Sequence, residues 1–316
     1  MKKILVIGGA GYIGSHVVKA MLEAGFAVSV FDNLFPGQEN NLFKEAEFIK
    51  GDILDYAALT SAMQGMDGVV HLAAKKAVGE SMVNPDLYSR NNVIGSLNIL
   101  MAMNEVGVKN IIFSSSAAVY GMPEYLPLDE AHPLKPISYY GFTKQKIEEF
   151  LEWYDRLKGI KYASLRYFNA VGYDGSGAVK GREKGVQNLL PIVMEVLAGR
   201  REKLQVFGTD YDTPDGTCIR DYVHVSDLAD AHVLAMQRLF DGGDSQVFNL
   251  GTGQGTSVKE IIDAVEKVFN VKLNIEYAPK RAGDPAKLYA ASDKARKMLG
   301  WKLAYTDIER IVKTAR

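Results

Sequence analysis

Three glycines near the start of the chain, Gly8, Gly11 and Gly14, constrain its fold more than any other feature. They follow a short β-branched run, residues 3–7, and precede a segment with helical periodicity, residues 12–24. Glycines in a strand-to-helix turn keep the turn tight and let a phosphate approach the amides that open the helix, where the helix dipole favours anions. The spacing G-x-x-G-x-x-G in this context predicts a dinucleotide site.

An acidic residue follows this turn at the distance that a dinucleotide site requires. The second expected strand, residues 27–31, ends at Asp32, roughly 20 residues beyond Gly14. Because a carboxylate accepts hydrogen bonds from both ribose hydroxyls and repels a 2′-phosphate, we expect NAD rather than NADP. After the third strand, Asp52 in the turn Gly51-Asp52-Ile53 is placed to face the adenine amino group, although hydrogen bonds to its own backbone explain an Asp in a turn equally well.

Strands and helices alternate along the first half of the chain. Further strands are expected at residues 47–50, 68–72, 110–113 and 162–166, and helices at 56–64, 85–106 and 138–157. Such alternation needs crossover connections, so the expected fold class is α/β, a doubly wound parallel (Rossmann) sheet with helices on both faces. Leu72, Ala73 and Ala74, at the end of the fourth strand, then lie at the carboxyl edge, where ligands bind in such sheets.

The second half of the chain differs from the first in composition and in the order of its expected elements. Residues 172–185 are rich in glycine and charge, and we expect a surface loop or flap there. The pattern at 221–224, a helix at 228–240 and an apolar run at 247–250 indicate a return to the parallel sheet. We therefore expect two interleaved domains: an NAD-binding domain of residues 1–169 and 219–250, and a smaller C-terminal α/β substrate domain of residues 170–218 and 251–316.

Composition excludes several classes of function. The 37 Lys and Arg nearly cancel the 38 Asp and Glu, so we expect no nucleic-acid partner and no attraction to an anionic membrane. The single Cys218 excludes a disulfide framework and a cysteine zinc site, and the 5 histidines lack metal-ligand spacing, so no metal is predicted. No apolar stretch approaches the roughly 20 residues of a membrane span, and we expect a cytoplasmic protein.

A second motif, a tyrosine and a lysine four residues apart, is typical of proton transfer. Tyr140 and Lys144 are four residues apart at the start of an expected helix, so their side chains fall on one face. Upstream, the serines at 114–116 follow the fifth strand at the same carboxyl edge. A tyrosine with a pKa of about 10 is a weak base at neutral pH and needs nearby positive charge to ionise. Lys144 and the nicotinamide ring of NAD would supply that charge, so the pattern predicts a Tyr–Lys pair that removes a proton from a substrate hydroxyl.

These motifs resemble those of the extended short-chain dehydrogenase/reductase family, the NAD-dependent epimerases and dehydratases, and within it the enzymes that epimerise UDP-sugars at carbon 4. The resemblance covers nearly the whole chain. It rests on residues 8–16 (GGAGYIGSH), 32–34 (DNL), 76–81 (KAVGES), 91–93 (NNV), 114–121 (SSSAAVYG), 166–169 (RYFN) and 220–225 (RDYVHV).

The resemblance implies that Tyr140 is the base, that Ser116 hydrogen-bonds the reacting sugar hydroxyl and that Lys144 holds the nicotinamide ribose. The implied reaction oxidises carbon 4 of UDP-galactose or UDP-glucose by hydride transfer to NAD, turns the 4-keto sugar over and returns the hydride to its opposite face. NAD is regenerated at every turnover and is expected to stay bound as a prosthetic group. The resemblance also implies a homodimer through the helices at 85–106 and 138–157.

Carboxyl-edge positions and the resemblance together define two sets of candidate binding residues. The NAD set comprises Gly8, Gly11, Tyr12, Ile13, Gly14, Asp32, Asn33, Asp52, Ile53, Leu72, Ala73, Ala74, Lys76, Asn91, Ser114, Tyr140, Lys144 and Phe168. The UDP-sugar set comprises Lys76, Ser116, Tyr140, Asn169, Asn188, Leu189, Phe207, Arg220, Arg281 and Asp284. Within it, Arg220 and Arg281 suit the diphosphate because guanidinium contacts phosphate in a bidentate manner.

Two residues depart from the family pattern or leave it open. Tyr139 stands where the family commonly has proline, so the backbone that enters this helix is less restricted, and we expect little effect on catalysis. Leu288 stands at the position that controls room for an N-acetyl group. Its medium aliphatic side chain leaves open whether N-acetylated UDP-sugars are also substrates.

Three other functions occur on folds of this kind. Sugar-nucleotide 4,6-dehydratases carry Asp-Glu where this chain has Ala117 and Ala118, and alanine cannot transfer protons, so dehydration is disfavoured. A UDP-glucuronate 4-epimerase stays open because Lys76 would supply the extra cation that a uronate needs. A noncatalytic NAD-binding sensor is the alternative of another class, and the presence of Tyr140, Lys144 and Ser116 argues against it.

Overall fold

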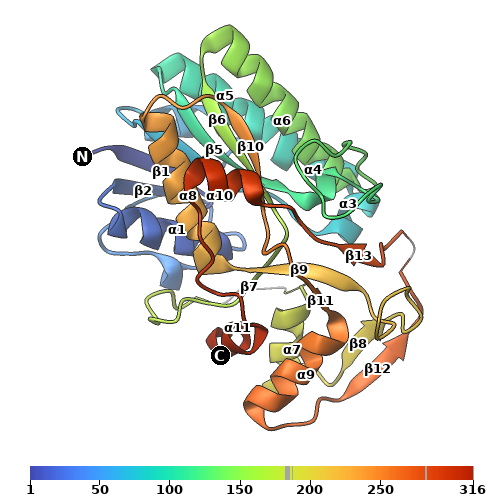
Figure 1. Ribbon diagram of the computed structural model, residues 1–316. Helices are drawn as coiled ribbons and strands as arrows, with labels where there is room; N and C mark the ends of the chain where they lie inside the picture. Colours follow the sequence, from blue (N-terminus) through green and yellow to red (C-terminus); the bar gives the residue numbers. More distant parts are fainter. Residues whose placement is uncertain (182–185, 187, 282, 316) are drawn as a thin grey trace.

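Seven strands form one parallel sheet in the order β10-β6-β5-β4-β1-β2-β3 (Figure 1). The structure is a computed structural model that describes residues 1–181, 186, 188–281 and 283–315. The strands of this sheet are β1 (Lys3–Ile7), β2 (Ala27–Asp32), β3 (Glu47–Lys50), β4 (Gly68–His71), β5 (Asn110–Ser116), β6 (Lys161–Tyr167) and β10 (Gln246–Leu250). All six neighbouring pairs are parallel, as the alternation of strands and helices predicts.

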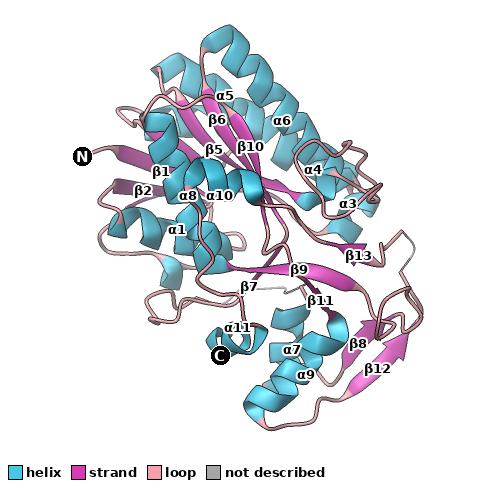
Figure 2. Ribbon diagram, in the orientation of Figure 1, coloured by secondary structure: helices cyan, strands magenta, loops and turns pink. Residues whose placement is uncertain are grey.

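Helices cover both faces of this sheet (Figure 2). Along β1, Ile4 and Val6 pack into one hydrophobic core, whereas Leu5 and Ile7 pack into another, because successive side chains of a strand point to opposite faces. The first core is closed by helices α1 (Tyr12–Glu23), α8 (Val225–Phe240) and α10 (Asp293–Leu299). The second is closed by α2 (Tyr56–Ala62), α5 (Gly95–Val106) and α6 (Tyr139–Lys158). The doubly wound α/β fold is confirmed.

A smaller lobe lies below the carboxyl edge of the main sheet in Figure 1. One of its sheets joins β7 (Asn169–Val171), β9 (Ile219–His224), β11 (Gly255–Ser257) and β13 (Lys287–Leu288), and a second pairs β8 (Leu204–Phe207) with β12 (Ile275–Ala278). Helices α7 (Leu189–Leu197), α9 (Val258–Phe269) and α11 (Ile308–Thr314) share a third hydrophobic core with residues of these strands. This lobe therefore has its own core next to the cleft.

The expected return of residues 221–224 to the main sheet is wrong. Strand β9 pairs in parallel with β7 and β13 and antiparallel with β11, and it makes no ladder with the seven-stranded sheet. The buried carboxylate of Asp221 accepts hydrogen bonds from the amides of Thr252, Gly253 and Ala290, which bind β9 to the segments around the smaller sheet. Helix α8 and strand β10 do return to the main fold, as expected.

The expected helix at 85–106 is divided into three parts. Helix α4 (Pro85–Tyr88) leads into a π-helical turn (Ser89–Ile94) and then into α5. Within the turn, the buried side chain of Asn92 accepts from the amide of Lys75 at 2.8 Å and donates to its carbonyl at 2.9 Å. A π-turn of this kind lets one side chain leave the helix for a distant partner, and such turns are frequent at functional sites.

The expected surface loop and an unexpected helix complete the comparison with the sequence. The N-terminal part of the expected surface loop, residues 172–181, contains no helix or strand, and residues 182–185 lie outside the described residues. Helix α3 (Val78–Val83) was not anticipated. Across the ranges that the structure describes, no helix is both long and apolar enough to cross a membrane.

Candidate active site

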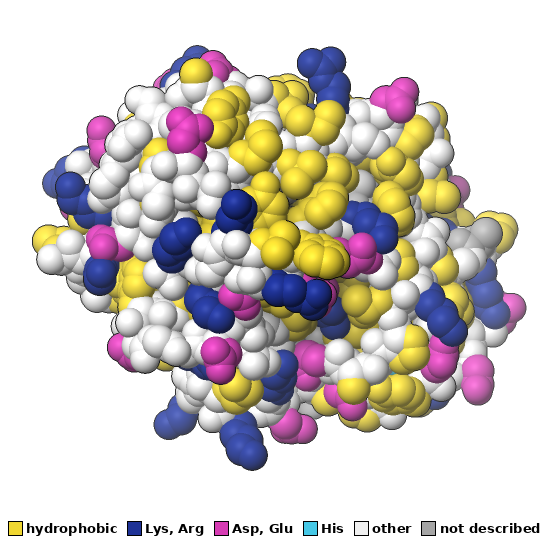
Figure 3. Space-filling view, turned by 90° about the horizontal axis from the view of Figure 1, so that it is seen from above, with side chains coloured by type: hydrophobic (Ala, Val, Ile, Leu, Met, Phe, Trp, Pro, Cys, Tyr) yellow, Lys and Arg dark blue, Asp and Glu magenta, His cyan; other side chains and the backbone are white. Residues whose placement is uncertain are grey.

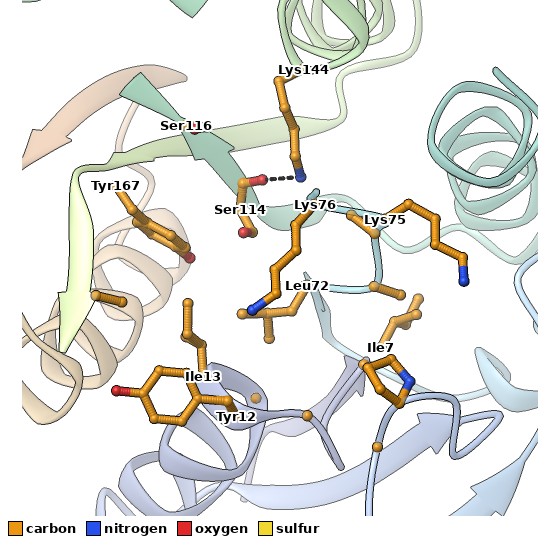
Figure 4. Close-up of a pocket in the computed structure, with 18 of the residues that line it drawn as sticks. Ile7, Tyr12, Ile13, Leu72, Lys75, Lys76, Ser114, Ser116, Lys144 and Tyr167 are labelled. Atoms are coloured by element: carbon orange, nitrogen blue, oxygen red, sulfur yellow. Dashed lines mark hydrogen bonds between the residues drawn. The ribbon is translucent and has the colours of Figure 1, made fainter. Parts of the chain in front are cut away.

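A cleft of about 460 Å³ opens at the carboxyl ends of the main strands. Its walls come from the turn after β1, the loops after β2 and β4, the ends of β5 and β6, and the first turn of α6 (Figure 4). Parallel sheets of this type bind ligands at this edge, where the strand order reverses. Arg220 of β9 and Leu288 of β13 bring the smaller lobe to the same cleft.

The glycine turn is built so that no larger residue fits its key positions. Gly8 has φ +88°, and a Cβ atom there would lie 2.6 Å from the amide nitrogen of Ala73. At Gly14 a Cβ atom would lie 2.1 Å from the carbonyl oxygen of Gly8. Gly11 is the N-cap residue of helix α1 and supplies no side-chain cap, so the first amides of the helix face the cleft. The turn fits a pyrophosphate on the helix N-terminus.

Asp32 ends β2 beside this turn. Its carboxylate accepts hydrogen bonds from the amides of Ala10, at 3.0 Å, and Leu34, at 2.7 Å. Burial raises the pKa of Asp32, while these two amides act in the opposite direction. Asn33 donates to Asp52 at 2.9 Å, which joins the loops after β2 and β3. Asp32 is thus held rigidly where a ribose would lie next to the glycine turn.

Tyr140 and Lys144 project from α6 toward the ends of β5 and β6. Ser138 caps the helix by accepting from the amide of Gly141 at 3.1 Å. The Lys144 ammonium donates to the carbonyl of Ser114 at 2.6 Å, the contact that Figure 4 marks, and lies 5.9 Å from the centre of the Tyr140 ring. Lys144 is buried, so its charge acts on Tyr140 across protein rather than water.

Burial moves the pKa values of both members of this pair. The pKa of Tyr140 is raised to about 12 by burial, and a hydrogen bond with Ser116 acts in the opposite direction. The pKa of Lys144 is lowered to about 7 by burial, and the carboxylate of Glu148 acts against that shift. Burial therefore moves the two pKa values apart, so positive charge beside Tyr140 is needed to bring the pKa of its hydroxyl down toward neutral pH.

Lys76 reaches into the middle of the cleft from the loop after β4 (Figure 4). It is exposed to the interior of the cleft, but the surrounding walls remove much of its solvent, and burial lowers its pKa to about 8. A cation held in this place is suited to an anionic group of a bound ligand.

The two predicted diphosphate cations, Arg220 and Arg281, lie in the smaller lobe. Arg220 lines the cleft and forms an ion pair with Asp284, and it donates to the carbonyl of Ile219 at 2.7 Å. The guanidinium of Arg281 stacks 3.9 Å from the centre of the Phe207 ring. These four predicted residues thus form two contacts between the strands and loops of the smaller lobe.

The structure places most of the predicted binding residues in the lining of this cleft. Those that line it are Gly8, Gly11, Tyr12, Ile13, Gly14, Asp32, Asn33, Ile53, Leu72, Ala73, Ala74, Lys76, Asn91, Ser114, Ser116, Tyr140, Lys144, Phe168, Asn169, Asn188, Arg220 and Leu288. Those that do not line it are Asp52, Leu189, Phe207, Arg281 and Asp284. Asp52 and Asp284 nevertheless contact lining residues, through Asn33 and Arg220 respectively.

Several residues of the site had no signal in the sequence. Phe35 and Lys75 line the cleft, and the Lys75 ammonium lies 4.5 Å from the centre of the Phe35 ring. Behind the catalytic pair, Glu148 forms a buried ion pair with Arg166. The spacing of Lys144 and Glu148 predicts that they share one face of a helix. The contacts of Glu148 with Arg166, and of Lys75 with Phe35, join different elements and could not be predicted from spacing.

Comparison with known proteins agrees with this architecture. Residues 4–251 match the model of the NAD dependent epimerase/dehydratase family. The chain belongs to this family. Over 99% of its length it is 46% identical to the UDP-glucose 4-epimerase of Lacticaseibacillus casei, and the match covers 95% of that protein.

Solved structures of the same kind superpose over nearly the whole chain. A UDP-glucose 4-epimerase from Brucella ovis in complex with NAD has a TM-score of 0.97 and 43% identity, with 100% of this chain and 97% of that one covered. A UDP-glucose 4-epimerase from Bifidobacterium longum in complex with NAD⁺ and UDP has a TM-score of 0.91 and 39% identity, with 99% and 97% covered.

Proposed function

We propose that this chain is an NAD-dependent isomerase that interconverts UDP-galactose and UDP-glucose. The observation that carries the proposal is the Tyr140–Lys144 pair beside Ser116, at the edge of a cleft whose opposite wall is the glycine turn and Asp32. The full-length similarity to UDP-glucose 4-epimerases supports the choice of substrate.

The residues of the chain divide the chemistry between them. Tyr140 accepts the proton of the sugar's 4-hydroxyl and later returns it, and Ser116 holds that hydroxyl by a hydrogen bond. Lys144 stabilises the Tyr140 phenolate by its charge and anchors the nicotinamide ribose. Bound NAD supplies the reversible hydride acceptor for carbon 4. Inversion follows because the 4-keto sugar presents its other face before it is reduced.

The cofactor is held along the wall opposite the catalytic pair. The amides of Tyr12 and Ile13 at the start of α1 meet the pyrophosphate, and Asp32 binds the adenosine ribose. Asp52 and Ile53 lie on the adenine side, and Lys76, Asn91 and Phe168 on the nicotinamide side. The turnover leaves NAD unchanged, so this site has no need to release it in each cycle.

The nucleotide end of the substrate is assigned to the smaller lobe. Arg220 and Arg281 bind the diphosphate, Asp284 binds the uridine ribose and Phe207 faces uracil, while Asn169, Asn188 and Leu189 contact the sugar and diphosphate. A guanidinium suits a diphosphate because its fork matches two phosphate oxygens. We propose an NAD-binding domain of residues 1–169 and 219–250 and a substrate domain made of the other two segments, although β9 pairs into the smaller sheet and α10 packs against the main core.

Two related substrates remain alternatives. Leu288 lines the cleft, and its size decides how well an N-acetyl group fits. Lys76, a cation with a lowered pKa, favours a uronate as the second candidate substrate. A dehydratase remains disfavoured, since Ala117 and Ala118 line the cleft where a proton-transferring acid and base would be needed.

The proposal includes a homodimer. Figure 3, which looks down on the face that carries α5 and α6 in Figure 1, shows hydrophobic side chains gathered into one broad area. Exposed apolar residues of the helices in this region are Met82, Val83, Leu87, Ile94, Met101, Phe142, Trp153 and Leu157. Apolar patches of this kind mark protein interfaces, and we assign this one to a second copy of the chain in the cytoplasm.

One experiment separates the proposed function from its alternatives. The purified protein is incubated with UDP-galactose, UDP-N-acetylgalactosamine or UDP-galacturonate without added NAD, and the 4-epimer is detected in each case. Formation of UDP-glucose from the first supports the proposal. Conversion of the uronate alone would keep the Tyr140 mechanism and replace the substrate, and no conversion despite bound NAD would favour the sensor.

A further inference from the structure

Phe35 and Lys75 come from two loops that the sequence separates by about 40 residues. Phe35 lies in the loop after β2 and Lys75 in the loop after β4, and the Lys75 ammonium lies 4.5 Å from the centre of the Phe35 ring. A cation at this distance from the face of an aromatic ring is attracted by its quadrupole. Both residues line the cleft.

The order of the strands determines what lies beneath this contact. In the main sheet, β1 stands between β4 and β2. A contact between the loops after β2 and β4 therefore passes across the carboxyl end of β1, where the glycine turn begins. The dinucleotide proposed above runs along this same line, from the start of α1 toward Asp32. The Phe35–Lys75 contact thus spans its path.

Both partners are held by their backbones. The amide of Phe35 donates to the side chain of Asn33 at 2.9 Å, and further along the loop Asn41 donates to the carbonyl of Ala10 at 3.0 Å. The amide and carbonyl of Lys75 bond to the buried side chain of Asn92, as described for the π-turn. Because the backbone is anchored at both residues, little conformational entropy is lost when the two side chains come into contact.

The contact itself is at the surface. Phe35 is 72% exposed, and the Lys75 side chain that contacts it is half-buried. A contact with one such exposed partner opens far more easily than the anchored loops on either side of it. Opening of this contact would therefore let a bound ligand leave the cleft without disturbing the fold.

We infer that Phe35 and Lys75 are further cofactor-site residues, which close a strap over the dinucleotide and slow its release. The inference rests on the proposed function, because it requires a dinucleotide in the cleft. It explains how a redox cofactor that is regenerated in every turnover stays in place while UDP-sugars enter and leave at the other end of the cleft.

The strap is tested by the rate at which bound NAD exchanges. Purified protein that carries its NAD is mixed with an excess of radiolabelled NAD, and incorporation of label is followed by rapid gel filtration. For Phe35→Leu and for Lys75→Met we expect exchange to be about 2- to 30-fold faster than in the unaltered protein, the range of a cation–π contact. Lys75→Arg should retain slow exchange, since guanidinium also stacks on aromatic rings.

The double variant decides whether the two residues act through their contact. If they do, Phe35→Leu/Lys75→Met exchanges NAD no faster than either single variant, because the contact is already lost. Multiplication of the two single effects would overturn the strap. Phe240→Leu serves as a matched control, since Lys2 lies 5.2 Å from that ring at the end of the sheet away from the cleft, and exchange should be unaltered.

The remaining outcomes separate the strap from the proposed function. Unaltered exchange in both single variants, with NAD bound and epimerase activity present, would overturn the strap alone. A purified protein that neither contains nor takes up NAD would overturn the proposed function and the strap with it.

Discussion

Glu148 lies one turn of α6 beyond Lys144, on the same buried face of the helix. Its carboxylate accepts from Arg166 at 2.6 Å and from the hydroxyl of Ser115 at 2.5 Å. The negative charge raises the pKa of Lys144 against the effect of burial. Burial, together with the charge of Lys144, lowers the pKa of His71 to about 3, so His71 is uncharged near neutral pH and does not oppose Glu148. Glu148 therefore acts on Tyr140 through Lys144.

The first prediction concerns Glu148→Gln. Without the carboxylate, the pKa of Lys144 falls, so the lysine loses its proton at lower pH and stabilises the Tyr140 phenolate less. The pKa of Tyr140 then rises, and the acidic limb of the kcat–pH profile should move to higher pH. We expect kcat at neutral pH to fall about tenfold or more, the effect of roughly one pKa unit, with KM for UDP-galactose changed by less than about twofold.

A matched control separates charge from packing at this position. Ser115→Ala removes a hydrogen bond to Glu148 but leaves its charge, and we expect a kcat–pH profile like that of the unaltered protein. Thermal unfolding of both variants reports any loss of stability, which is expected because Arg166 loses a buried partner in Glu148→Gln. A profile shifted equally in the two variants would contradict the electrostatic role of Glu148.

The second prediction uses two adjacent tyrosines. Tyr140→Phe removes the proposed base, and we expect kcat to fall about 10²- to 10⁴-fold while bound NAD is retained. Tyr139→Phe removes a hydroxyl that lies 2.6 Å from Ser89, away from Lys144, and should leave kcat within about threefold. The kinetics of the two variants, with NAD content measured by absorbance of the released nucleotide, check this. Substantial turnover by Tyr140→Phe would refute the assignment of the base.

The third prediction concerns the diphosphate. Arg220→Met removes a bidentate guanidinium from the cleft, and we expect the Kd of UDP to rise about 10- to 100-fold, as for the loss of a charged hydrogen-bond donor. Titration calorimetry with UDP measures it. Lys280→Met removes a neighbouring cation that pairs with Asp210 instead, and UDP affinity should be unchanged. Equal losses in both variants would indicate a general effect of charge.

The fourth prediction concerns the apolar face. Met101→Glu on α5 and Trp153→Glu on α6 place charges in the area assigned to a second copy, so each should give a mass near the 34.8 kDa of one chain instead of twice that value. Light scattering after gel filtration measures the mass. Tyr277→Glu, at an exposed aromatic position on β12, should remain dimeric. A dimer in all three variants would place the interface elsewhere.

Much of the fold was predictable because local signals and the global fold agree. The β-branched run before Gly8 and the helical pattern after Tyr12 specify one strand–turn–helix unit without reference to the rest of the chain. The spacing of Tyr140 and Lys144 is likewise local. For such features, periodicity and turn chemistry are sufficient.

What the sequence did not predict depends on partners that are distant along the chain. The residue pattern of β9 predicts a strand but not the sheet that it joins. That sheet is determined by hydrogen bonds from the amides of Thr252 and Ala290, more than thirty residues away, to the buried carboxylate of Asp221. The Arg166–Glu148 ion pair and the Phe35–Lys75 contact likewise join different elements of the fold. Periodicity carries no information about such pairs.

In the proposed function, this cleft epimerises a UDP-sugar at carbon 4 with NAD that it already holds. The most direct measurement is the conversion of UDP-galactose by the purified protein without added NAD, with UDP-glucose detected by a specific dehydrogenase. We predict steady conversion to an equilibrium mixture, with no net accumulation of NADH on the enzyme after many turnovers. Failure to form UDP-glucose by a protein shown to contain NAD would contradict it.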